Sequence, residues 1–432
     1  MRNPYTFSIF RDSGLFSSAG IECVDIGEAK FWTFGAHING LEGANELAVG
    51  ASDLSRSGAL RRGLGELVER AALSFADDEQ AISVDAHLNY PRKTLIEGGL
   101  ISPEFETSGL IEGKNLSDGS VVHVPAELAT YRSLEAGSDA STSGVERSPS
   151  GTASGLSRNS ALVRALYELV ERDSFMRAWV GCADYIVWSD SMLDDHTRSS
   201  PSRPILDGLR DRGCHVSVAV VPTEFGIIVC VAVVHWTSVS GVDLCVVGLG
   251  ASTSARVAVS KAILEGCQLY LLVVRYAEMQ RTNGAMAAYG FEMSKLSELA
   301  SGSYTLEVKR FLDAGHDGSA FPEYASGTLP GLKDEKCEEL RYSELLTSLL
   351  SAGMEVLSVD LTERLPAELR DVGWEVHKCF VNGLQPLRIN ELASWNWSTS
   401  ALSPVRSGGT GGAGRRCKGM MNILCRARHP LP

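Results

Sequence analysis

Three stretches of this 432-residue chain share one combination of features, and that repetition constrains the fold more than any other property of the sequence. Residues 59–73, 161–175 and 258–272 are apolar around most of a helical circumference. Each also carries a basic residue followed by polar residues four and seven positions later, which places all three on one helical face. The three stripes are Arg62, Glu66 and Glu69; Arg164, Glu168 and Glu171; and Lys261, Glu265 and Gln268.

Such helices have two interpretations. A surface helix holds these residues as ion pairs between successive turns, and a single ExxER segment is typical of that arrangement. A helix that is apolar on nearly all sides is usually buried, and a buried carboxylate is costly unless it is paired or bound to a metal. Three copies in one chain favour the second interpretation, because repeated elements that pack with pseudo-symmetry bring their stripes to one place.

The chemistry of the combined stripes indicates a ligand. Mg²⁺ takes oxygen ligands and readily shares phosphate oxygens with carboxylates. Arginine and lysine neutralise the phosphates themselves. The three stripes therefore predict a site for a magnesium-bridged triphosphate that needs no glycine-rich phosphate loop.

Two glycine-rich segments are weaker signals. Residues 409–414 (GTGGAG) match a dinucleotide-binding pattern, but no strand precedes them and no apolar helix follows, so we interpret them as a loop. Residues 248–253 (GLGAST) join an expected strand to the third helix, and we interpret them as a tight turn near the nucleotide. The nine histidines show no spacing typical of a metal site.

Composition excludes several classes of function. The net charge of −13 offers no basic field for nucleic acid. The longest apolar run, residues 227–236, is too short to cross a membrane, and the first residues contain no signal-peptide apolar region. The ten cysteines are scattered without a C-x-x-C pair, so we expect reduced thiols and a cytoplasmic location.

The order of expected elements predicts a mixed α/β (α+β) fold, with a mixed sheet covered by long helices. Three β-branched runs at 215–221, 227–236 and 242–250 are typical of an antiparallel meander. Further strands are expected at 30–35, 121–124, 354–361 and 374–381, and helices at 57–76, 160–179, 255–279 and 343–353. We divide the chain into an N-terminal segment (1–40), a catalytic domain (41–390) with a loop or linker near 137–156, and a Gly/Arg-rich tail (391–432).

The helical segments, taken in order, resemble the YcaO family. The matching stretches are GELVER at 65–70, residues 152–173 with the second ExxER, and residues 248–268 with the later Glu and Gln. Residues 381–389 (VNGLQPLRI) also resemble a late family segment, with Asn382 where proline is usual. The resemblance covers roughly residues 40–390 and implies a YcaO-like fold whose Glu-bearing helices surround a site for ATP and Mg²⁺.

The resemblance also implies a set of ligands. The residues that would bind the nucleotide and its metal are Glu66, Glu69, Arg70, Glu168, Glu171, Arg172, Glu265 and Gln268. The metal ligands among them would be Glu66, Glu69, Glu168, Glu171 and Glu265. Arg70 is either a ligand or an ion-pair partner, and Arg62 stands where many family members have serine.

The chain ends in RHPLP (428–432), which is similar to the proline-rich tail of azoline-forming members, with Arg428 replacing the first proline. Prolines stiffen an extended tail, and a stiff tail can deliver the terminal carboxylate of Pro432 as a general base. The alternative is a frayed terminus without a role.

The resemblance implies an ATP-dependent peptide cyclodehydratase that forms thiazolines or oxazolines from Cys, Ser or Thr of a ribosomally made peptide. It implies a precursor peptide as substrate, a ThiF-like partner that binds the leader peptide, a flavin-dependent azoline dehydrogenase acting afterwards, and a homodimer. Two alternatives stay open: a YcaO-type enzyme that makes a thioamide or macrocyclic amidine, and a nucleotide-binding accessory protein for another modifying enzyme.

Overall fold

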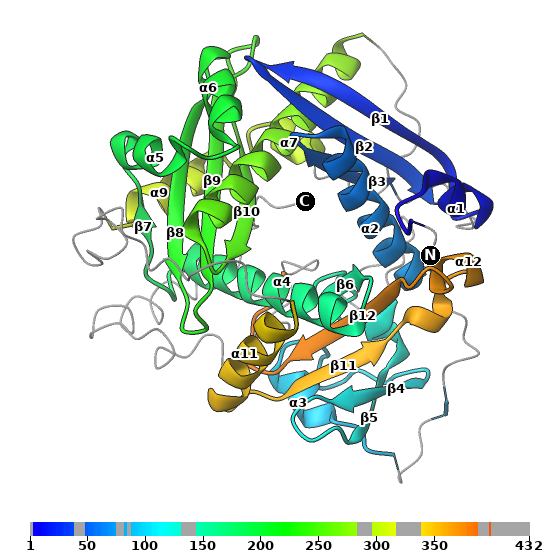
Figure 1. Ribbon diagram of the computed structural model, residues 1–432. Coiled ribbons are helices and arrows are strands. Elements are labelled where there is room, and N and C mark those ends of the chain that lie inside the picture. Colours follow the sequence, from blue (N-terminus) through cyan, green and yellow to red (C-terminus); the bar gives the residue numbers. More distant parts are fainter. Residues whose placement is uncertain are drawn as a thin grey trace.

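The computed structural model describes residues 3–38, 48–74, 82–83, 88–130, 144–282, 296–316, 338–387 and 397–398. These residues form three sheets and a set of helices, which confirms the predicted mixed α/β class. The expectation of a mixed sheet is wrong for the described strands, because every strand pair in the three sheets is antiparallel. The three stripe-bearing segments are long helices, as predicted: α2 (Arg56–Ser74), α4 (Arg158–Trp179) and α7 (Ala255–Arg281). They lie toward the middle of the molecule, with the sheets arranged around them (Figure 1).

The three sheets have the strand orders β1-β2-β3, β10-β9-β8-β7 and β5-β4-β11-β12-β6. The predicted meander is confirmed, since β8, β9 and β10 are consecutive antiparallel neighbours. The strands are β1 (Phe16–Ile26), β2 (Ala29–Ile38), β3 (Ala48–Asp53), β4 (Leu110–Asn115), β5 (Val121–Pro125), β6 (Thr152–Gly155), β7 (Ile186–Val187), β8 (His215–Pro222), β9 (Ile228–Thr237), β10 (Asp243–Ser252), β11 (Val356–Asp360) and β12 (Glu375–Val381).

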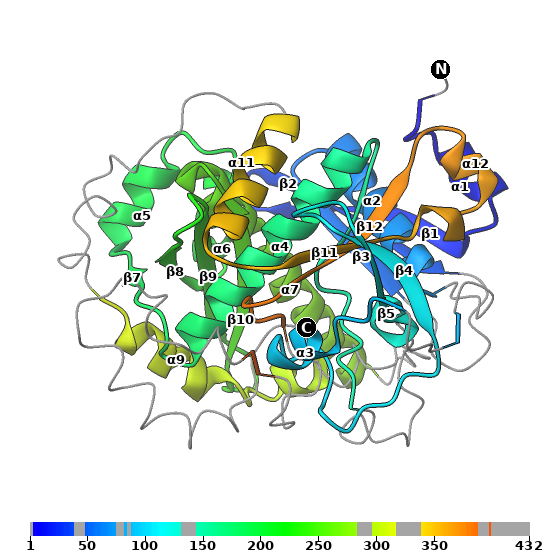
Figure 2. The same cartoon turned by 90° about the horizontal axis from the view of Figure 1, so that it is seen from below.

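Shorter helices cover the outside of the sheets. The helix α11 (Glu338–Ser351) packs against α4 and leads to β11, as Figure 2 shows from below. The others are α1 (Phe7–Asp12), α3 (Arg92–Glu97), α5 (Asp190–Thr197), α6 (Arg203–Asp211), α9 (Thr305–Ala314), α12 (Ala367–Arg370) and the 3₁₀ helices η2 (Ala126–Ala129) and η4 (Thr362–Arg364).

Each of the three long helices follows the edge strand of a different sheet. β3 leads into α2, β6 into α4 and β10 into α7, and each connection ends in a serine. The Oγ of Ser157 accepts the N–H of Ser160 at the start of α4, and the Oγ of Ser55 accepts the N–H of Gly58 at the start of α2. A serine in this position satisfies an amide that the first turn of a helix leaves unpaired. The chain thus contains three copies of one strand–helix unit.

The packing forms two hydrophobic cores. One joins α4, α7 and the β7–β10 sheet, and the other joins α1, β2, α2 and the β4–β12 sheet around Trp374. The strand β12 contributes to both, with Val376 and Phe380 in one and Cys379 and Val381 in the other. The strand β12 is therefore covered on both faces, although Glu375, His377 and Lys378 interrupt its apolar residues.

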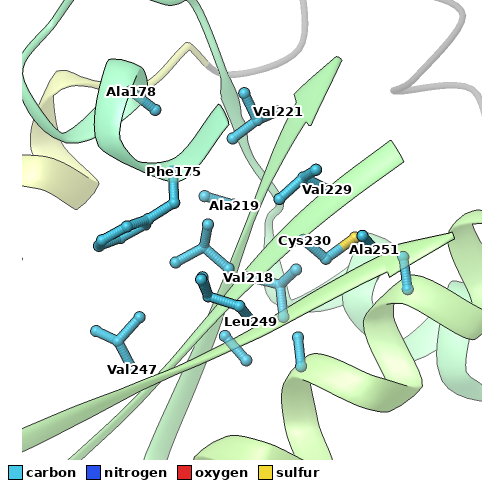
Figure 3. Close-up of a cluster of buried hydrophobic side chains, with 14 of the residues drawn as sticks. Phe175, Ala178, Val218, Ala219, Val221, Val229, Cys230, Val247, Leu249 and Ala251 are labelled. Atoms are coloured by element: carbon cyan, nitrogen blue, oxygen red, sulfur yellow. The ribbon is translucent and has the colours of Figure 1, made fainter. Parts of the chain in front are cut away.

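Two glycines determine how closely α7 packs on β10. A Cβ atom on Gly248 would lie 2.2 Å from the backbone N of Gly266, and one on Gly250 would lie 2.2 Å from the carbonyl O of Ala258. The interpretation of residues 248–253 as a tight turn is therefore wrong, because these glycines lie inside a strand that continues to Ser252. Figure 3 shows the neighbouring core, where Leu249 lies near Val218 and Phe175.

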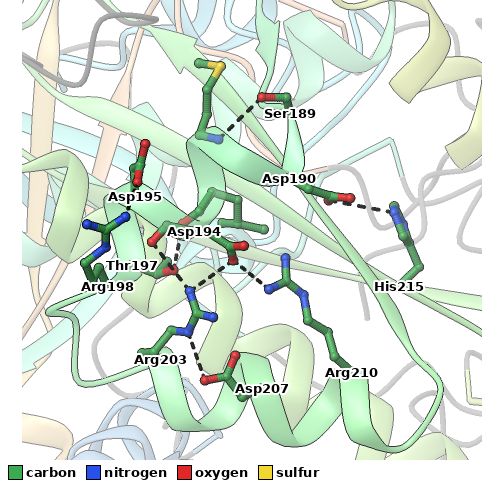
Figure 4. A network of polar contacts seen from close by, with 12 residues as sticks. Ser189, Asp190, Asp194, Asp195, Thr197, Arg198, Arg203, Asp207, Arg210 and His215 are labelled. Atoms are coloured by element: carbon green, nitrogen blue, oxygen red, sulfur yellow. Dashed lines mark hydrogen bonds and ion pairs between the residues drawn. The ribbon is translucent and has the colours of Figure 1, made fainter.

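A polar network that includes none of the stripe residues joins α5 to α6. The carboxylate oxygen Oδ1 of Asp194 accepts hydrogen bonds from Arg203 at 3.0 Å and from Arg210 at 2.6 Å (Figure 4). Arg203 also pairs with Asp207 one helical turn later. These residues remain partly exposed, so the network aligns two surface helices rather than forming a buried site.

Three further expectations can be compared with the structure. The expected linker near 137–156 is shorter than predicted at its C-terminal end, because residues 152–155 form β6 and pair with β12.

The helix α7 is long and apolar enough to meet the criteria for a membrane span, but it packs on β9 and β10 as a core helix. Cys182 is disulfide-bonded, so the expectation of ten reduced cysteines is wrong there, while Cys23, Cys214, Cys230, Cys245, Cys267 and Cys379 are free.

Candidate functional site

The stripe residues are accessible although the helices that carry them are largely buried. On α4, Leu169 and Val170 are buried in the core, whereas Glu168 and Glu171 keep partial exposure. The same alternation occurs on α2 and α7. The stripes therefore face a region outside both hydrophobic cores.

Backbone amides orient one carboxylate on each helix. The N–H of Ser154 donates to Glu69 Oε1 at 3.0 Å, and the serine hydroxyl donates to the same oxygen at 3.2 Å. The N–H of Gly151 donates to Glu168 Oε2 at 2.8 Å, and the N–H of Leu249 donates to Glu265 Oε2 at 2.7 Å. Each bond uses one oxygen of its carboxylate, so the other oxygen can contact a second partner, which for Glu168 is Arg172.

Hydrogen bonds also connect the three strand–helix units with one another. Ser154 belongs to the unit of α4, and its partner Glu69 belongs to α2. The amide Nε2 of Gln268, on α7, donates to the carbonyl O of Gly50 in β3 at 3.1 Å. The helices α2, α4 and α7 thus meet through contacts between side chains and the neighbouring backbone.

Two arginines accompany the carboxylates on their own helices. Arg172 Nη2 donates to Glu168 Oε1 at 3.1 Å, and Arg70 Nη2 lies 3.6 Å from Glu66 Oε1. Both pairs span one helical turn and are partly exposed. Pairs of this kind stabilise a protein by only about 0.3–0.5 kcal/mol each. A ligand that breaks such a pair to bind the arginine or the carboxylate therefore loses little free energy of binding.

The other basic stripe residues contact acceptors outside the acidic pairs. Arg62 Nε lies 3.1 Å from Asp53 Oδ2. Lys261 Nζ donates to the carbonyl O of Ala251 at 2.9 Å, and its positive charge also acts on Glu171. These cations remain close enough to the carboxylates to act on an anionic ligand between the helices.

The pKa values show that carboxylates from all three helices share one region. Burial, together with the negative charges of Glu168 and Glu66, raises the pKa of Glu69 to about 8. Burial raises the pKa of Glu171 to about 8, with Glu265 adding to the effect. The pKa of Glu265 is raised by burial and by Glu168. Glu69, Glu168 and Glu265 therefore lie around a common space, and Glu66 lies beside Glu69 on α2.

These acids are better suited to a cation shared with a bound ligand than to a metal site whose ligands all come from the protein. In the part of the chain that the structure describes, no group of three or more His, Cys, Asp or Glu could hold a metal ion by itself. Carboxylates that repel each other and retain protons are nevertheless stabilised by a dication placed between them. Mg²⁺ is usually held by a few carboxylates together with substrate phosphates and water, which matches this set.

The structure thus brings together the predicted acidic and arginine site residues, whereas the described contact of Gln268 is with the Gly50 carbonyl in β3. Their roles as individual ligands stay predictions. Pro432 lies outside the described residues, as does the rest of the tail beyond Ser398. Of the late segment 381–389, residues 381–387 are described, and the backbone N–H of Gln385 donates to the buried carboxylate of Asp173, next to Arg172.

Sequence reasoning missed Gly151 and Ser154, whose amides hold Glu168 and Glu69. A signal for Ser154 was present, because residues 51–56 (ASDLSR) and 153–158 (ASGLSR) stand at the same distance ahead of the two ExxER segments. The repeated six residues include the end of the edge strand and the first residue of the long helix in both units, β3 with α2 and β6 with α4. Gly151 has φ +76°, a conformation that favours glycine, but a single glycine in a Ser-rich stretch carries no distinctive pattern.

A protein-family model described as YcaO cyclodehydratase, ATP- and Mg²⁺-binding, matches residues 50–385. These limits include all three long helices and the strands that precede them, except the first two residues of β3. A search of curated protein sequences finds no match.

Solved structures resemble the whole chain. YcaO from Methanopyrus kandleri, bound with AMPPCP and Mg²⁺, matches with a TM-score of 0.62 at 19% identity, over 94% of this chain and 92% of that one. A heterocyclase in complex with substrate and cofactor matches with a TM-score of 0.62 at 16% identity, over 89% of this chain but 52% of that one. The E. coli microcin synthetase McbBCD complex with pro-MccB17 bound matches with a TM-score of 0.58 at 14% identity, over 95% and 96%. Identities this low show a shared fold.

Proposed function

This chain belongs to the YcaO cyclodehydratase family, whose members bind ATP and Mg²⁺, and on that premise we propose that it is an ATP-dependent peptide cyclodehydratase. In this proposal it activates backbone amides of a ribosomally made peptide and converts Cys, Ser or Thr residues to thiazolines or oxazolines. One observation carries the proposal. Carboxylates from α2, α4 and α7 meet with raised pKa values in one region that basic side chains also border.

The first task of the site is to hold the triphosphate. The proposed Mg²⁺ ligands are Glu66, Glu69, Glu168, Glu171 and Glu265. Bound Mg²⁺ would supply positive charge to the phosphate oxygens as they are transferred. Arg172 and Lys261 stand beside the acids, where their positive charges would pair with phosphate oxygens. Positioning and charge stabilisation provide most of the acceleration in phosphoryl transfer, so this arrangement suits the reaction.

The second task is the chemistry of the peptide. The thiol or hydroxyl of the substrate adds to the preceding backbone carbonyl and loses its proton to a base. The carbonyl oxygen takes the γ-phosphoryl group of ATP, which releases ADP. That oxygen then leaves as phosphate while the amide nitrogen loses its proton, and the resulting C=N bond within the ring completes the azoline. We assign the base to the terminal carboxylate of Pro432, on the strength of the RHPLP ending.

The partners in this proposal follow the same reaction. The precursor peptide is the substrate, and a ThiF-like protein presents its leader segment. A flavin-dependent dehydrogenase oxidises the azolines afterwards, the chain forms a homodimer, and the reaction takes place in the cytoplasm. The microcin synthetase complex shows that a protein of this fold can act together with partner proteins on a peptide precursor.

The test is mass spectrometry of a candidate precursor incubated with this protein, ATP and Mg²⁺, with and without a leader-binding protein encoded nearby. The expected result is the loss of one water for each modified Cys, Ser or Thr, with one ADP formed for each. The matched control is Glu171→Gln, which removes a proposed metal ligand and should abolish both products.

Other outcomes separate the alternatives. Incorporation of sulfur from added sulfide would indicate a thioamide-forming enzyme, and loss of water with a new link to an amine would indicate an amidine. Nucleotide binding with no change in any peptide mass would indicate an accessory protein. Each of these results would overturn the cyclodehydratase assignment while leaving the family intact.

A further inference from the structure

Lys378 is a buried cation that the reaction described above does not use. It lies in β12 between Val376 and Phe380, on the face that packs into the core around Trp374, and only 2% of its surface is exposed. An ammonium group inside an apolar core is strongly unfavourable unless it is paired and hydrogen-bonded. Lysine is rarely found so deeply buried without a specific reason.

The ammonium group is fully hydrogen-bonded to one short segment. Lys378 Nζ donates to the carbonyl O of Ser148 at 2.6 Å, to the carbonyl O of Ser150 at 3.2 Å and to Thr152 Oγ1 at 3.2 Å. These acceptors match the three protons that a lysine ammonium can donate. All of them belong to residues 148–154, which we call the bridging segment.

The bridging segment holds carboxylates on two helices. Its Gly151 N–H donates to Glu168 on α4, and its Ser154 N–H donates to Glu69 on α2. The second half of the segment is held by pairing between β6 and β12. The first half is irregular, and its described attachments to β12 are Lys378 and the bond from the Cys379 N–H to the Gly151 carbonyl O.

The charge of Lys378 also acts on the site. Burial lowers its pKa to about 7, while the negative charge of Glu168 opposes that shift and favours the charged form. The buried Glu146 favours the charged form as well. The lysine thus supports Glu168 in two ways, through the turn that presents Gly151 and through its positive charge.

We infer that Lys378 is a positioning residue for the nucleotide site, holding the bridging segment so that Gly151 keeps Glu168 in the orientation that receives Mg²⁺. The inference rests on the proposed Mg–ATP site. Partners behind metal ligands commonly change metal affinity by about 10–100-fold when they are removed.

The experiment measures binding of Mg²⁺ and a non-hydrolysable ATP analogue by calorimetry, with the whole chain. Lys378→Met should weaken Mg²⁺-dependent binding by about 10–100-fold. Thr152→Val, which removes one acceptor of the lysine, should weaken it less. The matched control is Arg92→Met, because Arg92 likewise donates to two backbone carbonyls, those of Pro103 and Phe105, in a part of the fold that does not reach the site.

A double-mutant cycle distinguishes positioning from a general loss of stability. If Lys378 acts through Glu168, adding Lys378→Met to Glu168→Gln should cause almost no further loss of binding, whereas general destabilisation would add to the first loss. Equal binding by Lys378→Met and the wild type, or additive losses in the cycle, would overturn the inference alone. If Lys378→Met does not fold, the same double-mutant cycle is measured with Thr152→Val in place of Lys378→Met, and its result tests the inference. Failure of the wild type to bind the analogue would overturn the proposed function together with the inference.

Discussion

At Glu69, the property that suits the residue to bind a metal ion also lowers the stability of the protein without its ligand. Its pKa of about 8 means that the free protein disfavours the charged carboxylate that a metal ion requires. Burial is the largest cause, and the negative charges of the other predicted ligands Glu168 and Glu66 add to it. Residues gathered to bind a ligand destabilise the protein while the ligand is absent, and this conflict is typical of functional sites.

The first prediction concerns Glu69→Gln, which keeps an acceptor for the two hydrogen bonds from Ser154 but removes the charge. The pKa in the folded state exceeds the ordinary value of 4.5, so the folded protein binds more protons than the unfolded chain between about pH 4.5 and 8. The free energy of unfolding therefore falls as pH rises through that range. The variant should be more stable than the wild type by about 1–3 kcal/mol at pH 8, with little difference at pH 5.

Urea unfolding of both proteins at several pH values measures this difference. Glu97→Gln is the control for removing a carboxylate charge elsewhere, because Glu97 lies at the end of α3 with a partly exposed side chain that pairs with Lys93. A Glu69→Gln variant whose stability follows the wild type at every pH would contradict the assigned pKa.

The second prediction concerns proton release. Metal ions bind the deprotonated form of their ligands, so binding of Mg²⁺ with nucleotide should displace protons from Glu69 and Glu171, whose pKa values are about 8. At pH 7 the release should be about one to two protons per site, and affinity should rise as pH increases toward 8. Calorimetry in two buffers of different ionisation enthalpy measures this. A binding heat that is the same in both buffers would rule out the linked protonation.

The strand–helix unit is the element that builds the site, and only part of it was predictable. The helices α2, α4 and α7 could be found because each is apolar over many turns, and the stripes singled out Glu residues whose roles as ligands stay predictions. The strand β6 was assigned to a linker because it has only four residues and sits in a Ser-rich stretch. Its pairing with β12 is a contact between residues more than 200 positions apart, and no local pattern reveals such a contact.

The third prediction tests the closest contact within such a unit. Gly248→Ala would place a Cβ atom 2.2 Å from a backbone atom of α7, so strand and helix must separate. We expect a loss of about 1–3 kcal/mol in the free energy of unfolding, as for other overpacked cores. Because Glu265 lies on α7 and is held by the amide of Leu249, nucleotide binding should weaken as well.

Gly20→Ala is the matched control for this substitution. Gly20 also lies in a strand, β1, but nothing lies within 4 Å of the Cβ position there. Its substitution should leave unfolding and binding within experimental error of the wild type. If Gly248→Ala behaved in the same way, the close approach of β10 and α7 would be wrong.

At the scale of the whole molecule, the fold class and the meander of β8–β10 were predictable, while the sheet orders were not. The β5-β4-β11-β12-β6 sheet combines strands from residues 110–155 with strands from residues 356–381. Apolar periodicity identifies each strand but does not say which distant strand is its neighbour. The overall arrangement was anticipated from the family resemblance instead, and the solved structures confirm it.

The fourth prediction concerns the C-terminal tail. Deleting Pro430–Pro432 should abolish cyclisation of the precursor, because the proposed base is lost, while leaving nucleotide affinity unchanged, because the three helices are intact. Calorimetry and mass spectrometry on one preparation test both statements. Full cyclisation by the shortened chain would remove Pro432 from the mechanism, and lost nucleotide binding would show that the tail contributes to the ATP site.

Each of the three sheets contributes one edge strand and one long helix to the same site. A ligand held by all three helices is released when any one of the sheets unfolds locally. Binding therefore adds the same free energy to the cost of unfolding each sheet. Amide hydrogens of the least stable sheet should therefore gain the greatest protection from exchange when Mg–nucleotide is added. The ligand would make the three sheets unfold as one cooperative unit, even though two separate cores hold the free protein together.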